Sequence, residues 1–223
     1  MLLKPYNTGD ELAILSLFKE CYGREMSVKY WKWRFIENPF RRILILLAWD
    51  NSALAAHYAV SPVLLLVKGQ PYMAALSLTT MTHPKYRGLK LFPKLARKVY
   101  EVIFQMGYTI VFGFPNKNSH RTFIKDLQWR DIYEIPTFRL NLHDYRKRIK
   151  DLSAKTVLED SVSEDNYFDL YYNTCFVKMP IQVCKDKTYL KWRYKMHPQN
   201  KYYNFVIANK DCVTSFCVVK KYV

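Results

Sequence analysis

The sequence predicts a mixed α/β domain followed by an incomplete second copy of its first part. Three observations carry this prediction. Short apolar segments separated by turns run from residue 43 to 82, which favours antiparallel strands joined by hairpins. Segments with strand and helix patterns then alternate as far as residue 142. In addition, two ten-residue segments around Trp33 and Trp192 match one another without gaps.

Two helices are predicted near the start of the chain. Residues 10–22 place apolar side chains close to helical spacing, and Thr8 or Asp10 can cap this helix. Residues 27–36 are rich in aromatic side chains and are predicted to form the second helix. This helix ends before Pro39, because the residue that precedes a proline disfavours the helical conformation.

Four strand segments are predicted next, each bounded by turn residues. They cover residues 43–49, 53–60, 63–67 and 72–82. The second and third form one strand that bends at Ser61 and Pro62, since proline cannot donate to a ladder.

Helices and strands alternate after residue 82. An amphipathic helix with an apolar face from Leu91 to Met106 ends at Gly107, a residue that suits the end of a helix. The segments that follow are a strand over 108–114, a helix that starts in the turn 115–119, and a strand over 131–142.

Composition excludes several classes of protein. Half of the 223 residues are apolar and 16% are aromatic, so the chain is not intrinsically disordered. No run of about 20 apolar residues can cross a membrane, and the N-terminus turns polar too early for a signal peptide. The five cysteines are odd in number and show no zinc spacing, which favours a reduced, cytoplasmic protein without a metal site.

The charge points to an anionic partner. The chain has 35 Lys and Arg against 19 Asp and Glu, a formal net charge of +16, which fits nucleic acid, anionic lipid or a phosphorylated cofactor. Residues 51–100 contain no acidic side chain and seven basic ones, so either a solvated lysine-rich surface or a focused anion site lies near residues 85–98. Nucleic acid is disfavoured, because no known nucleic-acid-binding pattern is present.

The internal repeat consists of residues 30–39 and residues 189–198. The two segments share Tyr, Lys, Trp, Arg and Pro at equal positions and lie 159 residues apart in the chain. At the same offset the apolar run 43–49 maps onto 202–208, which is also apolar. We therefore expect a first domain over 1–142, a linker over 143–160 and a partial second copy over 161–223.

The second copy is expected to form two helices and a hairpin of residues 202–208 with 212–219. Its outer strand needs a partner, because an edge strand presents unpaired N–H and C=O groups. The alternatives are the sheet of the first domain, a second chain in a homodimer through 161–223, or a further C-terminal half. Docking onto the first domain is the preferred expectation.

An anion-binding loop is predicted where the strand 72–82 leads into the helix that follows. Free N–H groups and the dipole at a helix start favour negative charge. Gly88 permits a close backbone approach, and Arg87 and Lys90 can add charge-assisted hydrogen bonds.

This arrangement resembles the GNAT superfamily of acyl-CoA-dependent N-acyltransferases. The resemblance covers residues 2–142 and rests on the loop HPxYRGxxxF at 83–92 and the turn GFPNxNS at 113–119. It is closest to a bacterial branch of that superfamily, which often carries a second, related half. The resemblance implies a mixed central sheet with two splayed strands, flanked by helices.

The resemblance also implies an activity. An acetyl or other acyl group would move from acyl-CoA to a primary amine of a small molecule by direct attack in a ternary complex, without a metal. Coenzyme A would lie in the cleft between the splayed strands, with its pyrophosphate on the N–H groups of 88–93. The implied cofactor-binding residues are Thr80, Met81, Thr82, Arg87, Gly88, Leu89, Lys90, Leu91, Phe92, Asn116 and Asn118.

The catalytic groups depart from the family pattern. The position of the usual tyrosine acid is occupied by Ile124, and the strand before the loop carries no carboxylate over 77–81. His57 and Tyr58, of which one should face the cleft, and Glu134 are the remaining candidates. A non-catalytic acyl-CoA-binding or scaffold protein with the same fold is therefore the alternative, and a nucleic-acid-associated protein is a third.

Overall fold

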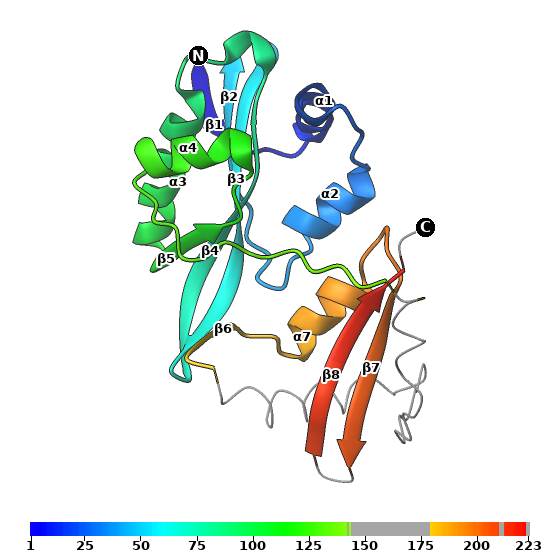
Figure 1. Ribbon diagram of the computed structural model, residues 1–223. Helices are drawn as coiled ribbons and strands as arrows, with labels where there is room; N and C mark the ends of the chain where they lie inside the picture. Colours follow the sequence, from blue (N-terminus) through cyan, green and yellow to red (C-terminus); the bar gives the residue numbers. More distant parts are fainter. Residues whose placement is uncertain (142, 144–178, 210–211, 222–223) are drawn as a thin grey trace.

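The computed structural model describes residues 1–141, 143, 179–209 and 212–221, and it shows a central sheet covered by helices (Figure 1). The strands follow one another in space as in the sequence: β1 (Leu2–Pro5), β2 (Leu44–Asp50), β3 (Ala53–Val67), β4 (Gln70–Thr82) and β5 (Ile110–Gly113). All neighbours are antiparallel except β4 and β5, which are parallel. The short strand β6 (Ile181–Val183) pairs with the end of β3.

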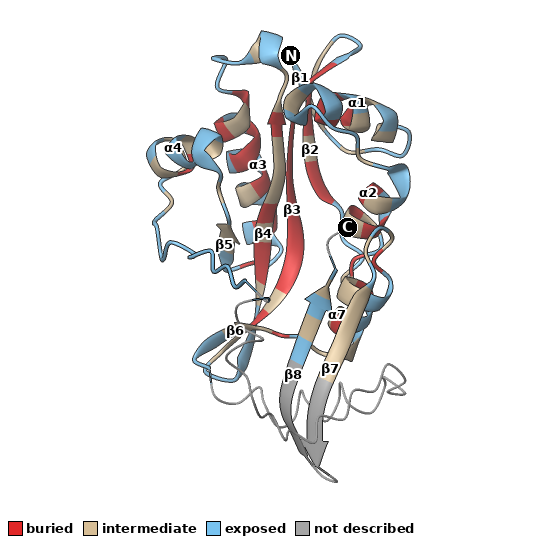
Figure 2. Ribbon diagram, turned by 45° about the vertical axis from the view of Figure 1, so that its right-hand side comes forward, coloured by how far each residue is buried: buried red, intermediate tan, exposed pale blue. Residues whose placement is uncertain are grey.

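Helices cover both faces of the sheet, and β3 lies buried between the two layers (Figure 2). The helices α1 (Glu11–Tyr22) and α2 (Val28–Phe35) pack on one face, around a core that includes Trp31. The 3-10 turn η1 (Pro84–Tyr86) leads from β4 to α3 (Leu91–Gln105), which covers the other face together with α4 (Lys117–Lys125).

The predicted ends of the first two helices are confirmed. The Ser27 hydroxyl accepts the N–H of Tyr30 at the start of α2. Asp10 occupies the cap position of α1, although its carboxylate bonds to the N–H of Asn7 and to Lys4 rather than to the helix. The α1 helix ends at Gly23, whose φ of 65° is costly for other residues.

The two central strands separate as expected. The parallel ladder joins β4 to β5 over only four residues and ends where Ser77 faces Gly113. Beyond this point β4 continues to Thr82 without pairing to β5. Thr79 has a φ of 52°, and the register against β3 shifts between His57 and Ala59, so β4 carries a bulge just after the point of separation.

The expectation of one strand through Ser61 and Pro62 is confirmed. The strand β3 runs from Ala53 to Val67 without interruption. Proline is tolerated there because pairing with β2 ends at Val60 and pairing with β6 starts at Leu65, so one edge of β3 has no partner between them among the described residues.

The expectation of a strand over 131–142 is wrong. Residues 131–141 have no regular secondary structure, and Ile132 and Phe138 are 93% and 88% exposed. A strand needs a neighbouring edge, and none of the described strands pairs with this segment.

The C-terminal part contains the predicted hairpin, formed by β7 (Tyr202–Asn209) and β8 (Cys212–Lys220). Docking of this hairpin onto the first sheet was expected and is wrong for the described residues, because β7 and β8 pair only with each other. The first helix expected in the second copy falls within 161–178, outside the described residues.

The helix expected after it is present as α7 (Lys187–Leu190), which continues into the π-helical turn η3 (Lys191–Lys195) and lies beside α2 (Figures 1 and 2). The two matching segments meet through Trp33 and Trp192, whose rings stack at 4.9 Å with an interplanar angle of 18°. Each indole N–H donates to the backbone carbonyl of the other tryptophan, at 2.9 and 3.0 Å. Both side chains are buried, so this reciprocal contact joins the C-terminal part to the first domain.

Replacement of Trp192 by alanine should lower the free energy of unfolding by about 3–5 kcal/mol, the range for a buried tryptophan. Replacement by phenylalanine keeps most of the apolar contact and removes one buried donor, so it should cost about 1–3 kcal/mol. Urea denaturation followed by circular dichroism would measure both. An unchanged midpoint for Trp192→Ala would contradict the assignment of this contact as the main junction.

Candidate functional site

A cleft of about 730 Å³ opens where β4 and β5 separate. One wall is the free part of β4, and the other is the chain that follows β5, from Phe114 to Asn116. The loop before α3 closes one end, and Ser77 and Gly113 form the opposite end, which we call the vertex. The cleft therefore results directly from the short parallel ladder.

The loop end of the cleft is built to accept an anion. Among the described residues no side chain caps the start of α3, so the N–H groups of Leu91 and Phe92 have no intrahelical or capping partner there, and Pro93 has no N–H. Gly88 has a φ of 85° and Lys90 a φ of 52°, which together turn the chain into the helix beside the cleft. Backbone N–H groups at such a helix start bind phosphate or carboxylate oxygens.

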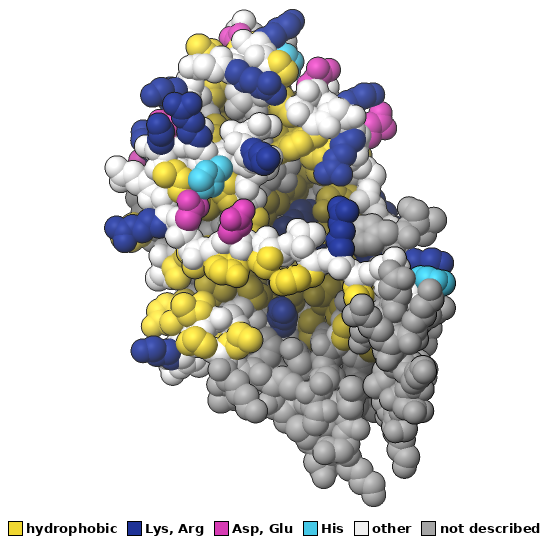
Figure 3. Space-filling view, in the orientation of Figure 1, with side chains coloured by type: hydrophobic (Ala, Val, Ile, Leu, Met, Phe, Trp, Pro, Cys, Tyr) yellow, Lys and Arg dark blue, Asp and Glu magenta, His cyan; other side chains and the backbone are white. Residues whose placement is uncertain are grey.

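Positive charge accompanies these N–H groups. Arg87 and Lys90 both line the cleft. Asp126 is the only carboxylate that lines it among the described residues, and it lies 3.8 Å from the Lys90 amine in an exposed contact. An exposed pair of this length contributes little, so Lys90 remains available to a ligand. On the face of the molecule that Figure 3 shows, basic side chains lie scattered around a band of hydrophobic ones.

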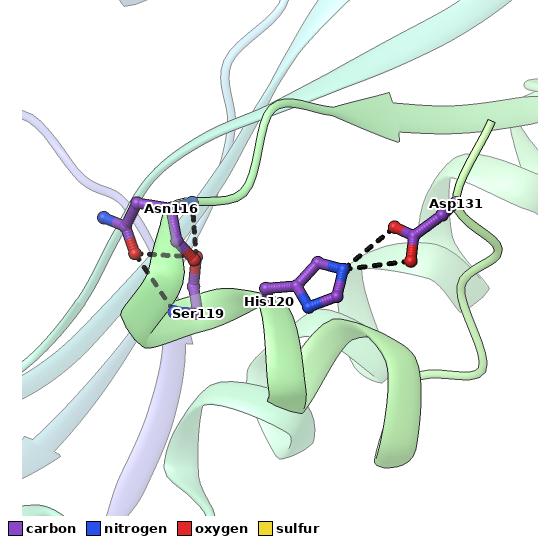
Figure 4. Close-up of polar contacts among 4 residues, drawn as sticks. All are labelled: Asn116, Ser119, His120 and Asp131. Carbon is purple, nitrogen blue, oxygen red and sulfur yellow. Dashed lines mark hydrogen bonds and ion pairs between the residues drawn. The ribbon is translucent and has the colours of Figure 1, made fainter. Parts of the chain in front are cut away.

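The turn between β5 and α4 supplies the opposite wall. The Asn116 side chain accepts the N–H groups of Asn118 and Ser119 at 3.0 Å each, and the Ser119 hydroxyl accepts the N–H of Asn116 (Figure 4). This reciprocal capping box fixes the start of α4. Asn116 and Asn118 both line the cleft, as expected from the motif.

A second polar contact lies on α4, one turn further along. His120 approaches both carboxylate oxygens of Asp131, at 2.9 and 3.1 Å (Figure 4). Neither residue lines the cleft. The contact fastens the chain that follows α4 to the helix.

Nearly all the residues expected to hold a cofactor come together in this cleft. Only Leu89 does not line it, and that side chain is 59% exposed. The others are Thr80, Met81, Thr82, Arg87, Gly88, Lys90, Leu91, Phe92, Asn116 and Asn118.

The structure does not bring the expected catalytic residues together. His57 and Tyr58 are both fully buried in the core, and neither lines the cleft, so the expectation that one of them faces it is wrong. The reason is that β3 lies inside the sheet with helices on both faces: Phe35 of α2 meets the His57 ring, and Tyr58 packs against Phe92 and Tyr100 of α3. Glu134 lies in the exposed segment after α4 and is also outside the cleft lining.

His57 has a structural contact instead. Its Nδ1 lies 2.8 Å from the carbonyl oxygen of Thr79, so Nδ1 carries the proton and donates. Burial lowers the pKa of His57 from 6.5 to about 4, and the ring is therefore neutral at pH 7. This hydrogen bond holds Thr79 in its left-handed conformation at the bulge.

Two residues at the end of α1 reach the cleft without any signal in the sequence. The Tyr22 hydroxyl donates to the carbonyl of Thr80 at 3.0 Å, and the Cys21 thiol lies 3.4 Å from the carbonyl of Thr82. Both residues line the cleft. They show that the carbonyls of β4 beyond the bulge are open to donors other than a strand.

No group of three or more His, Cys, Asp or Glu side chains among the described residues is placed to hold a metal ion. Within the same residues, no helix combines the length and the apolar character that a membrane span requires. Cys21, Cys184 and Cys217 are free thiols.

Comparison with known proteins supports the resemblance noted in the sequence. A family model described as an acetyltransferase (GNAT) domain matches residues 3–130. No curated protein matches the chain.

Solved structures share the fold at low identity. A protein from Agrobacterium tumefaciens assigned as an acetyltransferase is 15% identical over 63% of this chain and all of that chain, with a TM-score of 0.51. N-myristoyltransferase from Saccharomyces cerevisiae, solved with bound myristoyl-CoA and inhibitors, is 12% identical over 98% of this chain, with a TM-score of 0.61. The chain spans 58% of that protein.

The lowered pKa of His57 makes a prediction about acid stability. The unfolded chain binds a proton near pH 6.5 and the native protein only near pH 4, so native stability should fall as the pH drops through this window, by roughly 3 kcal/mol in total. His57→Gln should flatten this part of the curve of unfolding free energy against pH. The pKa of His197 is lowered to about 4 as well, so the variant should keep part of the acid sensitivity. Parallel curves for the variant and the parent protein would contradict the assignment.

Proposed function

The chain belongs to the GNAT acetyltransferase family, and on this premise we propose that it transfers an acetyl or other acyl group from acyl-CoA to the amine of a small molecule. The transfer would be a direct attack of the amine on the thioester carbonyl with both substrates bound. Positioning of the two reactants is then the main catalytic task.

The observation that carries this proposal is the uncapped start of α3 at one end of the cleft between β4 and β5. The diphosphate of coenzyme A would accept hydrogen bonds from the N–H groups after Gly88 and charge-assisted bonds from Arg87 and Lys90. These groups fit an anion with several oxygens better than they fit an uncharged ligand.

The pantetheine arm would extend from this end along the free part of β4. The carbonyls of Thr80 and Thr82 can accept hydrogen bonds from its amide N–H groups, in competition with Tyr22 and Cys21. Thr82 lies five positions beyond Ser77 along the strand, about 17 Å of extended chain. The reacting thioester would then lie near the vertex.

Removal of the amine proton would fall to water. Asp126 lies 3.8 Å from Lys90 at the anion end, and no other described carboxylate lines the cleft. The buried positions of His57 and Tyr58 and the exposed position of Glu134 do not favour a catalytic contact for any of the three.

A non-catalytic acyl-CoA-binding protein is the second candidate. It is favoured by two observations: among the described residues the only carboxylate that lines the cleft, Asp126, lies beside Lys90, and Ile124 stands at the position of the family's usual tyrosine. Acyl-CoA binding without turnover against a panel of small amines would favour it.

Residues 161–223 would be a partial second GNAT-like copy. Two pairs of matching features support this, and in each pair the residues are 159 positions apart in the chain. Asp186 caps α7 as Ser27 caps α2, and Trp192 stacks on Trp33. The similarity to N-myristoyltransferase also extends over 98% of the chain. This copy would shape the acceptor side of the cleft.

Replacement of Arg87 and Lys90 together by glutamate should weaken acetyl-CoA binding at least about 100-fold, since each side chain would supply a charge-assisted bond. Isothermal titration calorimetry would measure this, and the affinity of the parent protein should also fall with added salt. The double variant Lys94→Glu with Lys98→Glu is a matched control. It changes the net charge by the same amount, but these two lysines of α3 do not line the cleft. Equal losses in the two double variants, or no binding by the parent protein, would refute the proposed site.

A further inference from the structure

A row of hydrogen-bonded hydroxyl groups lies beneath the vertex of the cleft. The indole N–H of Trp129 donates to the Tyr100 hydroxyl at 3.1 Å, and this hydroxyl lies 2.9 Å from that of Tyr58. The Tyr58 hydroxyl lies 2.9 Å from the hydroxyl of Ser77. The four residues come from the chain after α4, from α3, from β3 and from β4, so only the folded protein assembles the row.

The direction of these hydrogen bonds follows from the indole, which can only donate. Tyr100 therefore accepts from Trp129, and the only described acceptor for its own proton is the oxygen of Tyr58. Tyr58 in turn donates to Ser77. The reverse direction would leave the proton of Tyr100 without an acceptor in a largely buried place, which is costly.

The proton of Ser77 is then the one that the row leaves free. Ser77 lines the cleft and is 9% exposed, so its hydroxyl can donate only toward that space. It is also the last residue of β4 that faces β5, which places it at the vertex, at the opposite end from Arg87 and Lys90.

Aromatic rings enclose the row. Phe92 stacks on Tyr58 at 5.8 Å and meets Phe123 at 4.9 Å, and Phe123 meets Trp129 at 4.2 Å. Burial raises the pKa of Tyr58 and of Tyr100, so both phenols stay protonated. Donors in series polarise one another in a site of low dielectric, which makes the Ser77 hydroxyl a stronger donor than an isolated serine.

We propose that Ser77 donates a hydrogen bond to the sulfur of coenzyme A as it leaves, and that Tyr58, Tyr100 and Trp129 are positioning residues that orient this donor. The inference rests on the proposed function. The amine nitrogen forms its bond to the carbonyl carbon, the carbon–sulfur bond breaks, and its electron pair goes to the sulfur. Ser77 keeps its proton and stabilises the thiolate, while the proton of the amine goes to water.

The test needs no acceptor, because free coenzyme A carries the same sulfur. Thiolate absorbance in the ultraviolet, followed against pH for coenzyme A bound to the protein, gives the pKa of the bound thiol. Ser77→Ala should raise this pKa by about 1, the scale of a hydrogen bond to a charged group. Tyr100→Phe removes the donor that polarises the Tyr58 hydroxyl, while Tyr58 still donates to Ser77, so it should raise the pKa by less.

Two controls separate this effect from a general loss of structure. Ser61→Ala removes the hydroxyl of another buried serine, on β3 and outside the cleft lining, and should leave the thiol pKa unchanged. Desulfo-coenzyme A, measured by calorimetry at pH 9, should bind Ser77→Ala and the parent protein equally, whereas coenzyme A should bind the variant about tenfold more weakly.

The outcomes distinguish the two proposals. No binding of coenzyme A to the parent protein overturns the proposed function itself. Binding with the same thiol pKa in Ser77→Ala and the parent protein overturns the role of Ser77 alone. A thiol pKa in Tyr100→Phe that is as unchanged as in Ser61→Ala overturns the polarisation of Ser77 through the hydroxyl row.

Discussion

The separation of β4 from β5 beyond Ser77 and Gly113 is the constraint on which the rest of this structure depends. A parallel ladder of only four residues leaves the end of β4 without a strand partner on one side. The bulge at Thr79, held by the neutral ring of His57, turns the strand at that point. The cleft, the β4 carbonyls that accept Tyr22 and Cys21 instead of a strand, and the position of the loop before α3 all follow from this geometry.

The two ends of the cleft differ in chemistry because different elements build them. The loop end offers unpaired N–H groups, Arg87 and Lys90, all suited to an anion. The vertex is enclosed by aromatic rings and presents the hydroxyl of Ser77. A ligand that carries phosphates at one end and a weakly polar reacting group at the other matches this polarity in one orientation only.

The C-terminal part depends on a different interaction. Its hairpin forms a sheet of its own, and the reciprocal bonds of Trp33 and Trp192 tie the neighbouring helix to the first domain. Arg34 and Arg193 lie about 6 Å from these rings, so cation–π contacts accompany the stacking. The matching segments therefore face each other, rather than lying in separate parts of the molecule.

The sequence by itself determined the local features: the first two helices, the amphipathic α3, the loop around Gly88, the turn at Asn116 and the C-terminal hairpin. Each depends on residues close together in the chain. Only the tertiary structure decided that His57 and Tyr58 are buried, that residues 131–141 form no strand, and that Ser77 meets Tyr58. Alternation along a strand shows that side chains point to two faces, but it does not show which face a helix covers or which edge finds a partner. Those outcomes depend on contacts between residues far apart in the chain.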